Sequence, residues 1–361
     1  MKAIEAGVVQ YAGQGPGTAS QAVPLPIWLV LAGNLLIGTS LWLIAAGGMG
    51  AKLILLGFWI AMLCAYARPV RITSDLLAGS LVLAGLIGVI ATGNGAILEK
   101  FRLIGNLLML PIGLLVGLVI GRDSLRVMVP VLVVYLLLSS SFQMTHEGMR
   151  LNQPFLFLGL FALCSVARWR GSRLLAAGSA LAVLFSQTRI AVLAMLVNLI
   201  GMIRFLRAMT WIVGIIALAV AGWFAMSHLP RLFLTHGSGR LAFWQDFWGM
   251  WQGGSAGQRW LGFGAGSVEE ILSGYQSFAS FGALHNDHFR ILFETGITGA
   301  ILWAAGWIVM LWTVRHVRLA VCILLSVMLT MVTDNTLNYG HYLVCCGIAA
   351  GIAVRVRRTH G

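Results

Sequence analysis

The densest group of ionisable side chains in the chain lies between residues 285 and 294. It reads His-Asn-Asp-His-Phe-Arg from residue 285 to 290, and Glu294 follows one helical turn later. A histidine that is neutral near pH 7 can take a proton from a hydroxyl group. His285 and His288 are three residues apart, so they could share a helical face, and Glu294 could orient a histidine or Arg290. The pattern favours acid–base chemistry; a metal-binding histidine pair, or a polar cluster that only closes a helix, are the alternatives.

Three arginines in other segments could supply positive charge to the same site. Arg189 follows Ser-Gln-Thr where two apolar runs nearly touch, and Arg150 lies in a short loop with His146 and Glu147. Arg240 opens a segment rich in aromatic residues. An arginine at a membrane boundary is costly unless it reaches water or pairs with an anion. Each arginine is therefore interpreted either as an interface anchor or as a ligand for an anion at the membrane surface.

The segment after Arg240 predicts an amphipathic helix that lies along the membrane surface, with Ser238 as its cap. Its aromatic residues recur at the spacing of one helical face; they are Trp244, Phe247, Trp248 and Trp251. Such a face could anchor the helix at headgroup depth, or form a platform for sugar rings or a polyprenyl chain. A guanidinium at the start of a helix could also bind a phosphate through two hydrogen bonds.

Two further segments carry less specific patterns. The glycines at 262, 264 and 266 resemble a dinucleotide-binding fingerprint, but no predicted strand precedes them, so the prediction is a tight structural turn. A turn near residues 334–340 contains side chains that could contact sugar hydroxyls; they are Asp334, Asn335, Asn338 and Tyr339.

The composition indicates that the elements positioning these residues lie in lipid. Hydrophobic residues make up 59% of the 361 residues and charged residues only 10%, against about 25% charged residues in a soluble domain. A helix that spans a bilayer needs about 20 apolar residues, so the chain has room for about a dozen spans and one large loop. The apolar runs lie at 27–47, 52–67, 76–92, 103–121, 127–141, 154–167, 174–187, 190–206, 211–227, 296–314, 319–333 and 341–354.

The cysteines and the net charge of +13 are also consistent with a membrane protein. All five cysteines fall within apolar runs without metal-site spacing, so small buried side chains are predicted, without a disulfide framework. Most basic residues gather in short clusters between alternate apolar runs, a pattern that sets membrane topology and does not indicate nucleic-acid binding. An even number of spans with both termini in the cytoplasm places each of these clusters on the cytoplasmic side.

The fold prediction is an all-α, polytopic membrane helical bundle of about twelve transmembrane helices, with one large outer loop that contains short amphipathic helices. Its parts are a cytoplasmic tail (1–26), nine helices (27–227), the loop with the ionisable cluster (228–295), three helices (296–354) and a second cytoplasmic tail (355–361). The apolar runs lack ionisable residues near their middles, where ion-coupled transporters usually carry them. The expected chemistry therefore lies at the outer surface, where an amphiphilic substrate would place its charged head.

The order of these motifs resembles the bacterial O-antigen ligase and polymerase superfamily, over about residues 180–312. The resemblance begins with Arg189 in a Ser-x-x-Arg junction and continues with Arg240 and Trp244 in an Arg-x-x-x-Trp segment early in the large loop. A Leu-Gly-x-Gly-x-Gly-Ser turn follows at 261–267. The run from His285 to Gly299 completes it as His-Asn-x-x-x-x-x-Leu-x-Glu-x-Gly-Ile-x-Gly.

The resemblance implies a metal-independent glycosyltransferase of the bacterial inner membrane, with its active site on the periplasmic face and without a cofactor. Members transfer a glycan from polyprenyl pyrophosphate to a hydroxyl group, which belongs to the lipid A core in ligases and to another lipid-linked glycan in polymerases. By motif position, His285 would be the base, and Arg189 and Arg240 would hold the pyrophosphate. The supporting candidates are Arg150, His288, Arg290, Glu294 and Trp244. Ligation is the favoured reading; polymerisation, a non-catalytic flippase or permease, and a structural or assembly protein of the membrane are the alternatives.

Overall fold

The computed structural model of the chain describes residues 25–45, 50–66, 74–145, 148–203, 240–274 and 283–358. These ranges contain 14 α-helices, one 3-10 helix and one antiparallel hairpin of two strands. The first part comprises α1 (Ile27–Ala45), α2 (Gly50–Tyr66), α3 (Ser74–Thr92), α4 (Ile97–Val119), α5 (Asp123–Ser139), β1 (Phe142–Thr145), β2 (Gly148–Leu151), α6 (Pro154–Val166), α7 (Ser172–Phe185) and α8 (Arg189–Met202). The second part comprises α10 (Arg240–Gly253), α11 (Ala256–Leu261), α12 (Ser267–Gly274), α13 (Asp287–Val314), α14 (Arg318–Thr333), η2 (Thr336–Asn338) and α15 (Gly340–Arg358).

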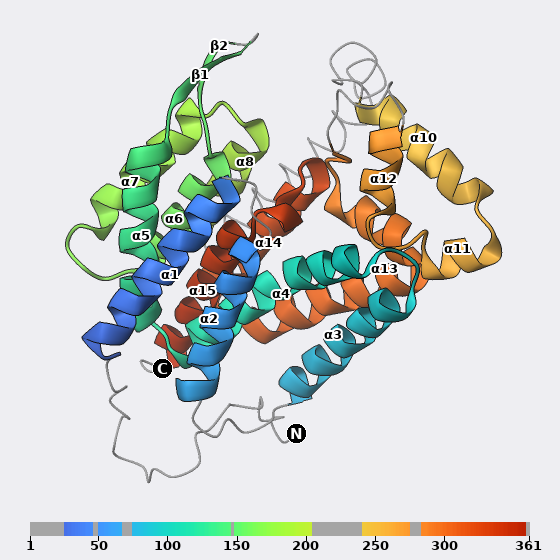
Figure 1. The fold of residues 1–361 in the computed structure, drawn as a ribbon. Helices are drawn as coiled ribbons and strands as arrows, with labels where there is room; N and C mark the ends of the chain where they lie inside the picture. The colour runs from blue at the N-terminus through green and yellow to red at the C-terminus, as the bar shows by residue number, and fades with distance from the viewer. Residues whose placement is uncertain are drawn as a thin grey trace, which may run out of the picture.

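The helices follow the apolar runs of the sequence closely. Eleven of the twelve predicted runs coincide with α1 to α8 and α13 to α15, and the twelfth, at 211–227, lies outside the described residues. The short helices predicted for the large loop are present as α10, α11 and α12. Figure 1 shows the β1–β2 hairpin and α10 projecting at one end of the bundle, away from the chain end marked C.

Four of the described helices, α1, α3, α4 and α13, are long and apolar enough to cross a membrane. Six further apolar helices are shorter, so they would need polar flanking residues or a thin part of the bilayer to span it. The chain is therefore a mostly helical protein with the apolar helices of a membrane-embedded protein. The number of about twelve spans stays a prediction.

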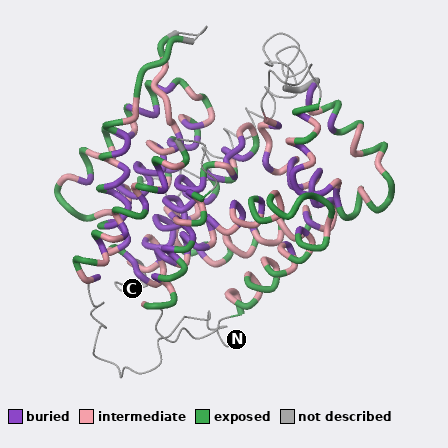
Figure 2. Tube along the Cα trace, in the orientation of Figure 1, coloured by how far each residue is buried: buried purple, intermediate pink, exposed green. Residues whose placement is uncertain are grey.

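The core of the bundle is the close pair of α4 and α15. An added Cβ at Gly117 would lie 2.2 Å from the carbonyl oxygen of Ile348, and one at Gly351 would lie 2.4 Å from that of Leu114. Small residues on both helices thus let the two backbones approach, as in many helix pairs within membranes. Figure 2 shows the buried residues concentrated in these central helices.

The outward faces of the peripheral helices are apolar and exposed. Trp28 and Leu35 on α1 are 65% and 72% exposed, and Leu81 on α3 is 65% exposed. Figure 2 shows exposed residues that recur along both helices. An apolar surface of this extent is unfavourable in water but matches lipid tails.

The prediction of buried cysteines holds for part of the set. Cys164, Cys345 and Cys346 are buried, whereas Cys322 is half-buried and Cys64 is exposed. The prediction was wrong for Cys64 because an apolar run does not show which side of its helix faces outwards. In a bundle whose outer surface is apolar, a small hydrophobic side chain can lie on either side.

Helix α13 is broken at Gly296, and the glycine-rich segment fills the break. Gly296 has φ 68° and ψ −170°, which are not helical. The amides of Phe263 and Gly264 donate to the carbonyl oxygens of Phe293 (2.9 Å) and Glu294 (3.0 Å). These bonds occupy carbonyl groups next to the break, which would otherwise lack a partner.

The glycines of this segment are required by backbone contact. Gly262 has φ +86°, and a Cβ there would lie 2.2 Å from the carbonyl oxygen of Glu294. The amide of Ala265 donates to the carbonyl of Asn94, between α3 and α4, at 3.1 Å. The predicted tight structural turn is therefore confirmed, and it fastens the loop region to α13 and to the α3–α4 connection.

Candidate functional site

The segment before α13 and the connection between α14 and α15 meet at one end of the bundle. The backbone amide of His285 donates to Oδ1 of Asn335 (3.0 Å), and the amide of Leu337 donates to Oδ2 of Asp287 (2.8 Å). Each segment therefore holds the backbone of the other. The predicted outer turn at 334–340 forms the second half of the site that contains His285.

Asp334 faces the imidazole ring of His285. Oδ1 of Asp334 lies 3.8 Å from Nδ1 of His285, so the contact is electrostatic and longer than a hydrogen bond. The same oxygen accepts hydrogen bonds from the amide of Asn335 (2.7 Å) and from the hydroxyl of Tyr339 (3.3 Å). A carboxylate on this side favours a proton on Nδ1, which leaves Nε2 of His285 to accept a proton from a substrate. The His285 side chain is 24% exposed, so a hydroxyl group can reach it.

Tyr339 supports Asp334 in this arrangement. Burial, together with the nearby carboxylate of Asp334, raises the pKa of Tyr339, so its hydroxyl stays protonated and donates. The Tyr339 ring stacks on Phe155 at 4.7 Å between ring centres. Phe155 lies at the start of α6, so this stack joins the α14–α15 connection to the segment that follows the β1–β2 hairpin.

His285 lies outside α13, in a left-handed conformation with φ +53°. The helix begins at Asp287, because Oδ1 of Asn286 caps it by accepting the amide of Phe289 (2.9 Å). The prediction that His285 and His288 could share a helical face is therefore wrong. A left-handed conformation at a non-glycine residue costs about 1–2 kcal/mol, and it persists here where Asn335 holds the His285 amide.

His288 is fixed in one neutral tautomer by two partners. The indole Nε1 of Trp303 donates to Nδ1 of His288 at 3.0 Å, so Nδ1 carries no proton. The proton of the neutral ring is then on Nε2, which donates to the carbonyl oxygen of Met328 at 3.2 Å. Because both nitrogens are occupied, His288 holds α13 to α14 and does not serve as a base. This assigns the two histidines different roles.

Arg290 and Glu294 form a buried ion-pair group with a residue of α12. The Arg290 guanidinium contacts Oε1 of Glu294 (3.2 Å) and Oε1 of Glu269 (2.8 Å), and its side chain is 4% exposed. Glu294 thus orients Arg290, which is one of the two alternatives predicted for it. The carboxylates of Glu294 and Glu269 both pair with the Arg290 guanidinium. Arg290 therefore joins α12 to α13 and is not available to a substrate anion.

Helix α10 packs through its aromatic residues on a small core of its own. Phe243 and Phe247 are buried against Phe293 of α13 and against residues of α12, whereas Trp248 is 42% exposed. The predicted aromatic face therefore packs partly inwards. Trp244 donates from its indole Nε1 to the carbonyl of Leu284 at 2.7 Å, directly before His285.

Arg240 is the first residue of α10, and its side chain and the predicted cap Ser238 lie outside the described residues. Its backbone precedes Trp244 by about one helical turn, or about 6 Å along the axis. Because Trp244 bonds to Leu284, the N-terminal end of α10 lies near the segment that carries His285.

Arg189 lies at the same end of the bundle as Asp334. Helix α8 packs along α14, and the guanidinium of Arg318 at the start of α14 donates to the carbonyl of Ile203 after α8 (3.1 Å). The two helices are therefore antiparallel, so the start of α8 lies beside the end of α14. Arg189 begins α8 and is exposed, while Asp334 directly follows α14.

Arg150 belongs to the hairpin next to Arg189. The side-chain amide of Gln187 donates to the carbonyl of Met149 at 3.2 Å, which joins strand β2 to the α7–α8 junction. Arg150 follows Met149 and Arg189 follows Gln187 by two positions. The structure therefore brings the segments of His285, Arg150, Arg189 and Arg240 to one end of the bundle, while direct contact is seen between His285 and Asp334.

Lys52 is a polar residue of this end that the sequence reading did not single out. Its Nζ donates to Oδ1 of Asn106 (2.6 Å), and Nδ2 of Asn106 donates to Oδ1 of Asn338 (3.2 Å). The signal that could have found it is a lysine at the first turn of an apolar run together with an amide inside another run. Nearby, Ser40 donates to the carbonyl of Ala51 (2.6 Å), so His341 Nε2, at 3.0 Å, donates to the Ser40 hydroxyl.

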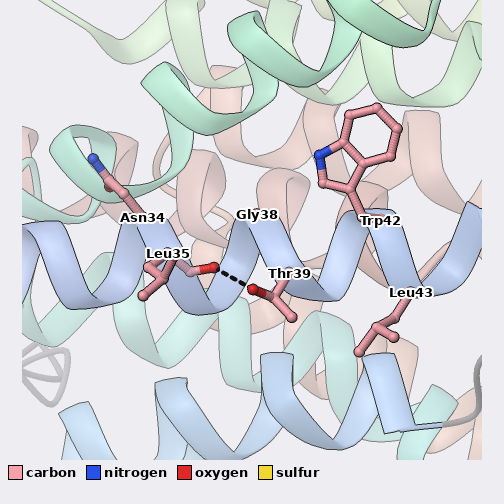
Figure 3. Close-up of a pocket in the computed structure, with 6 residues that line it drawn as sticks. All are labelled: Asn34, Leu35, Gly38, Thr39, Trp42 and Leu43. Carbon is pink, nitrogen blue, oxygen red and sulfur yellow. Dashed lines mark hydrogen bonds between the residues drawn. The ribbon is translucent and has the colours of Figure 1, made fainter.

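A groove of about 460 Å³ is present on α1 but lacks this chemistry (Figure 3). In its lining, the hydroxyl of Thr39 is bonded to the carbonyl of Leu35 at 2.9 Å. The lining contains no ionisable side chain; it consists of Asn34, Leu35, Gly38, Thr39, Trp42 and Leu43. The groove can therefore receive an apolar chain but cannot move a proton or bind a phosphate by charge.

No protein-family model matches the chain, and no curated protein matches it significantly.

Proposed function

We propose that the protein is a metal-independent membrane glycosyltransferase that moves a glycan from polyprenyl pyrophosphate to a hydroxyl acceptor. The observation that carries this proposal is the pair of His285 and Asp334 at the end of an apolar helical bundle. The segments of Arg189 and Arg240 reach the same end, which supports an anionic substrate whose lipid tail lies among the helices. The motif order that resembles the O-antigen ligase and polymerase superfamily supports the same reaction.

The residues suit a displacement at the anomeric carbon of the donor sugar. Nε2 of His285 takes the proton of the acceptor hydroxyl while the hydroxyl oxygen forms a bond to that carbon. The bond between the carbon and the phosphate oxygen breaks, and its electron pair leaves with the polyprenyl pyrophosphate. Asp334 stabilises the imidazolium of His285, and Arg189 and Arg240 stabilise the charge that builds on the leaving group.

The acceptor that we propose is the lipid A core, which makes the reaction an O-antigen ligation in lipopolysaccharide biosynthesis. The active site then faces the periplasm, and both termini lie in the cytoplasm of a bacterium, in agreement with the basic clusters of the sequence. Polymerisation of lipid-linked repeat units differs in the acceptor alone. A flippase or permease for the lipid-linked glycan would use the same cations without the base.

A purified assay separates these reactions. The full chain in lipid nanodiscs is given a polyprenyl-pyrophosphate glycan, with or without lipid A core, and the products are resolved by mass. We expect glycan on the core, and we expect His285→Ala to abolish it while the protein stays folded. Growth of the lipid-linked glycan without core would instead identify a polymerase. Translocation without any product would identify a flippase, and full activity of His285→Ala would refute the role of His285.

A further inference from the structure

Lys52, in the first turn of α2, is tied to the same 3-10 turn that holds His285. The ammonium group donates to Asn106, and Asn106 donates to Asn338. The backbone amide of Asn338 donates to the backbone carbonyl oxygen of Asn335 at 3.0 Å, and this bond closes the turn. Asn335 in turn holds the backbone amide of His285. A chain of four hydrogen bonds therefore connects the ammonium of Lys52 to the residue that we propose as the base.

The turn at the centre of this chain of hydrogen bonds is compact. The Cα atoms at the two ends of such a turn lie within about 7 Å of each other. One end orients His285 through Asn335, and the other end orients the partner of Lys52 through Asn338. The ammonium and the imidazole are thus linked through one turn, although α2 and α13 are far apart in the sequence.

The electrostatic surroundings of Lys52 leave it able to bind an anion. Burial is the largest influence on the Lys52 ammonium and disfavours its charge; Arg102 and Arg290 also repel it, while Asp287 and Glu269 attract it. One oxygen of each carboxylate already has a partner, because Oδ2 of Asp287 accepts the backbone amide of Leu337 and Oε1 of Glu269 is paired with Arg290. An ammonium has three protons, and within the described residues one of them is donated to Asn106. A half-buried cation with protons to spare is stabilised when an anion reaches it.

We propose that Lys52 binds a phosphate oxygen of the polyprenyl-pyrophosphate donor, and that Asn106 and Asn338 position it for this contact. The inference rests on the proposed function, because it takes the donor of that reaction as the anion. It adds a cation on α2 to the arginines that the motifs assign. It also gives the turn at 334–340 a second role, since the turn then aligns the leaving group with the base.

Calorimetric titration of the full chain in detergent tests the proposal with three probes. They are polyprenyl pyrophosphate, inorganic pyrophosphate and an uncharged polyprenyl alcohol of the same length. We expect Lys52→Met to weaken binding of polyprenyl pyrophosphate about tenfold or more, as for the loss of one charge-assisted hydrogen bond. Binding of the alcohol should stay unchanged, and Lys52→Arg should keep most of the affinity. Arg173→Met is the matched control, since Arg173 is an exposed residue at the start of α7.

The inorganic probe shows whether Lys52 recognises phosphate alone or only a lipid headgroup. A parallel loss of inorganic pyrophosphate binding in Lys52→Met indicates phosphate recognition, and loss confined to the lipid probe indicates a headgroup held by its tail. Unchanged affinity of Lys52→Met for polyprenyl pyrophosphate would overturn the proposal, as would the absence of binding by the unaltered protein.

Two further variants keep the test decisive. If Lys52→Met lowers the melting temperature, Asn338→Ala serves as the test variant in its place. Asn338→Ala keeps the charge of Lys52 but releases Asn106. We expect it to lose several-fold in affinity for polyprenyl pyrophosphate. Unchanged affinity of Asn338→Ala would then count against the proposal. His285→Ala should bind polyprenyl pyrophosphate with an affinity within about twofold of that of the unaltered protein. The loss of a base slows the chemical step, whereas the loss of a binding residue weakens the affinity. A binding defect in Lys52→Met beside full transfer by His285→Ala would refute the proposed base and leave the phosphate site standing.

Discussion

Oδ1 of Asp334 lies 3.8 Å from Nδ1 of His285, although one residue follows α14 and the other precedes α13. The two helices form an antiparallel pair, so the start of α13 and the end of α14 meet at one end of the bundle. The amide of Asn335 and the hydroxyl of Tyr339 both donate to the same carboxylate oxygen. The position of the carboxylate is therefore fixed by its own connection before any substrate arrives.

The first prediction concerns the charge of Asp334. Asp334→Asn keeps the shape of the side chain but removes the charge that stabilises an imidazolium at His285. We expect the rate of glycan transfer to fall on the order of a hundredfold, within the range of acid–base contributions, while the melting temperature changes little. Asp246→Asn, at an exposed position of α10, is the control and should keep full activity. Equal rates for the two variants would remove Asp334 from the mechanism.

The sequence predicted the helices well because apolar runs in lipid are long and have clear polar ends. Arg189 and Arg240 begin α8 and α10, and a tight turn was correctly predicted at 261–267. What the sequence could not show is which distant ends meet. The sequence suggests only sugar contacts for Asp334, because its pairing with His285 depends on the packing of α13 against α14.

His285 and His288 show that sequence spacing can mislead even for residues three positions apart. Their spacing fits one helical face, but the cap at Asn286 ends the helix between them. Lys52 belongs to no motif of the sequence, since its partners Asn106 and Asn338 come from α4 and from the turn after α14. Side-chain partners from three separate elements cannot be read from spacing within any one of them.

The second prediction separates His288 from His285. Trp303→Phe removes the donor to Nδ1 of His288 and leaves a partly buried nitrogen without its partner. We expect a loss of about 1–3 kcal/mol in the free energy of unfolding, with glycan transfer per folded molecule preserved. Thermal unfolding in detergent, with activity normalised to folded protein, measures both. A large loss of transfer at unchanged stability would show that His288 takes part in the reaction.

The third prediction concerns the ion-pair group of Arg290. Arg290→Met leaves Glu294, whose side chain is fully buried, without its counter-charge. Breaking a buried pair on one side costs about 3–5 kcal/mol, so this variant should unfold at a much lower denaturant concentration. Adding Glu294→Gln should restore part of the loss, because the uncompensated charge disappears. Reversible unfolding in mixed micelles measures the cycle; additive losses would mean that the two residues do not act as a pair.

The last prediction concerns the break in α13. Gly262→Ala places a methyl group 2.2 Å from the carbonyl oxygen of Glu294, at a residue with φ +86°. The glycine-rich turn must then move off α13, and α11 and α12 move with it because they flank the turn. The contact between Glu269 and the buried Arg290 depends on the position of α12, so we expect both lower stability and lower transfer.

Gly249→Ala is the matched control for this change. Gly249 lies in the middle of α10, and an added Cβ there meets no atom within 4 Å. Alanine favours a helix interior over glycine by about 1 kcal/mol, so this variant should be as stable as the unaltered protein or slightly more stable. Limited proteolysis reports the release of the loop directly. If Gly262→Ala were cleaved no faster than Gly249→Ala, the turn would not be what fastens α11 and α12 to α13.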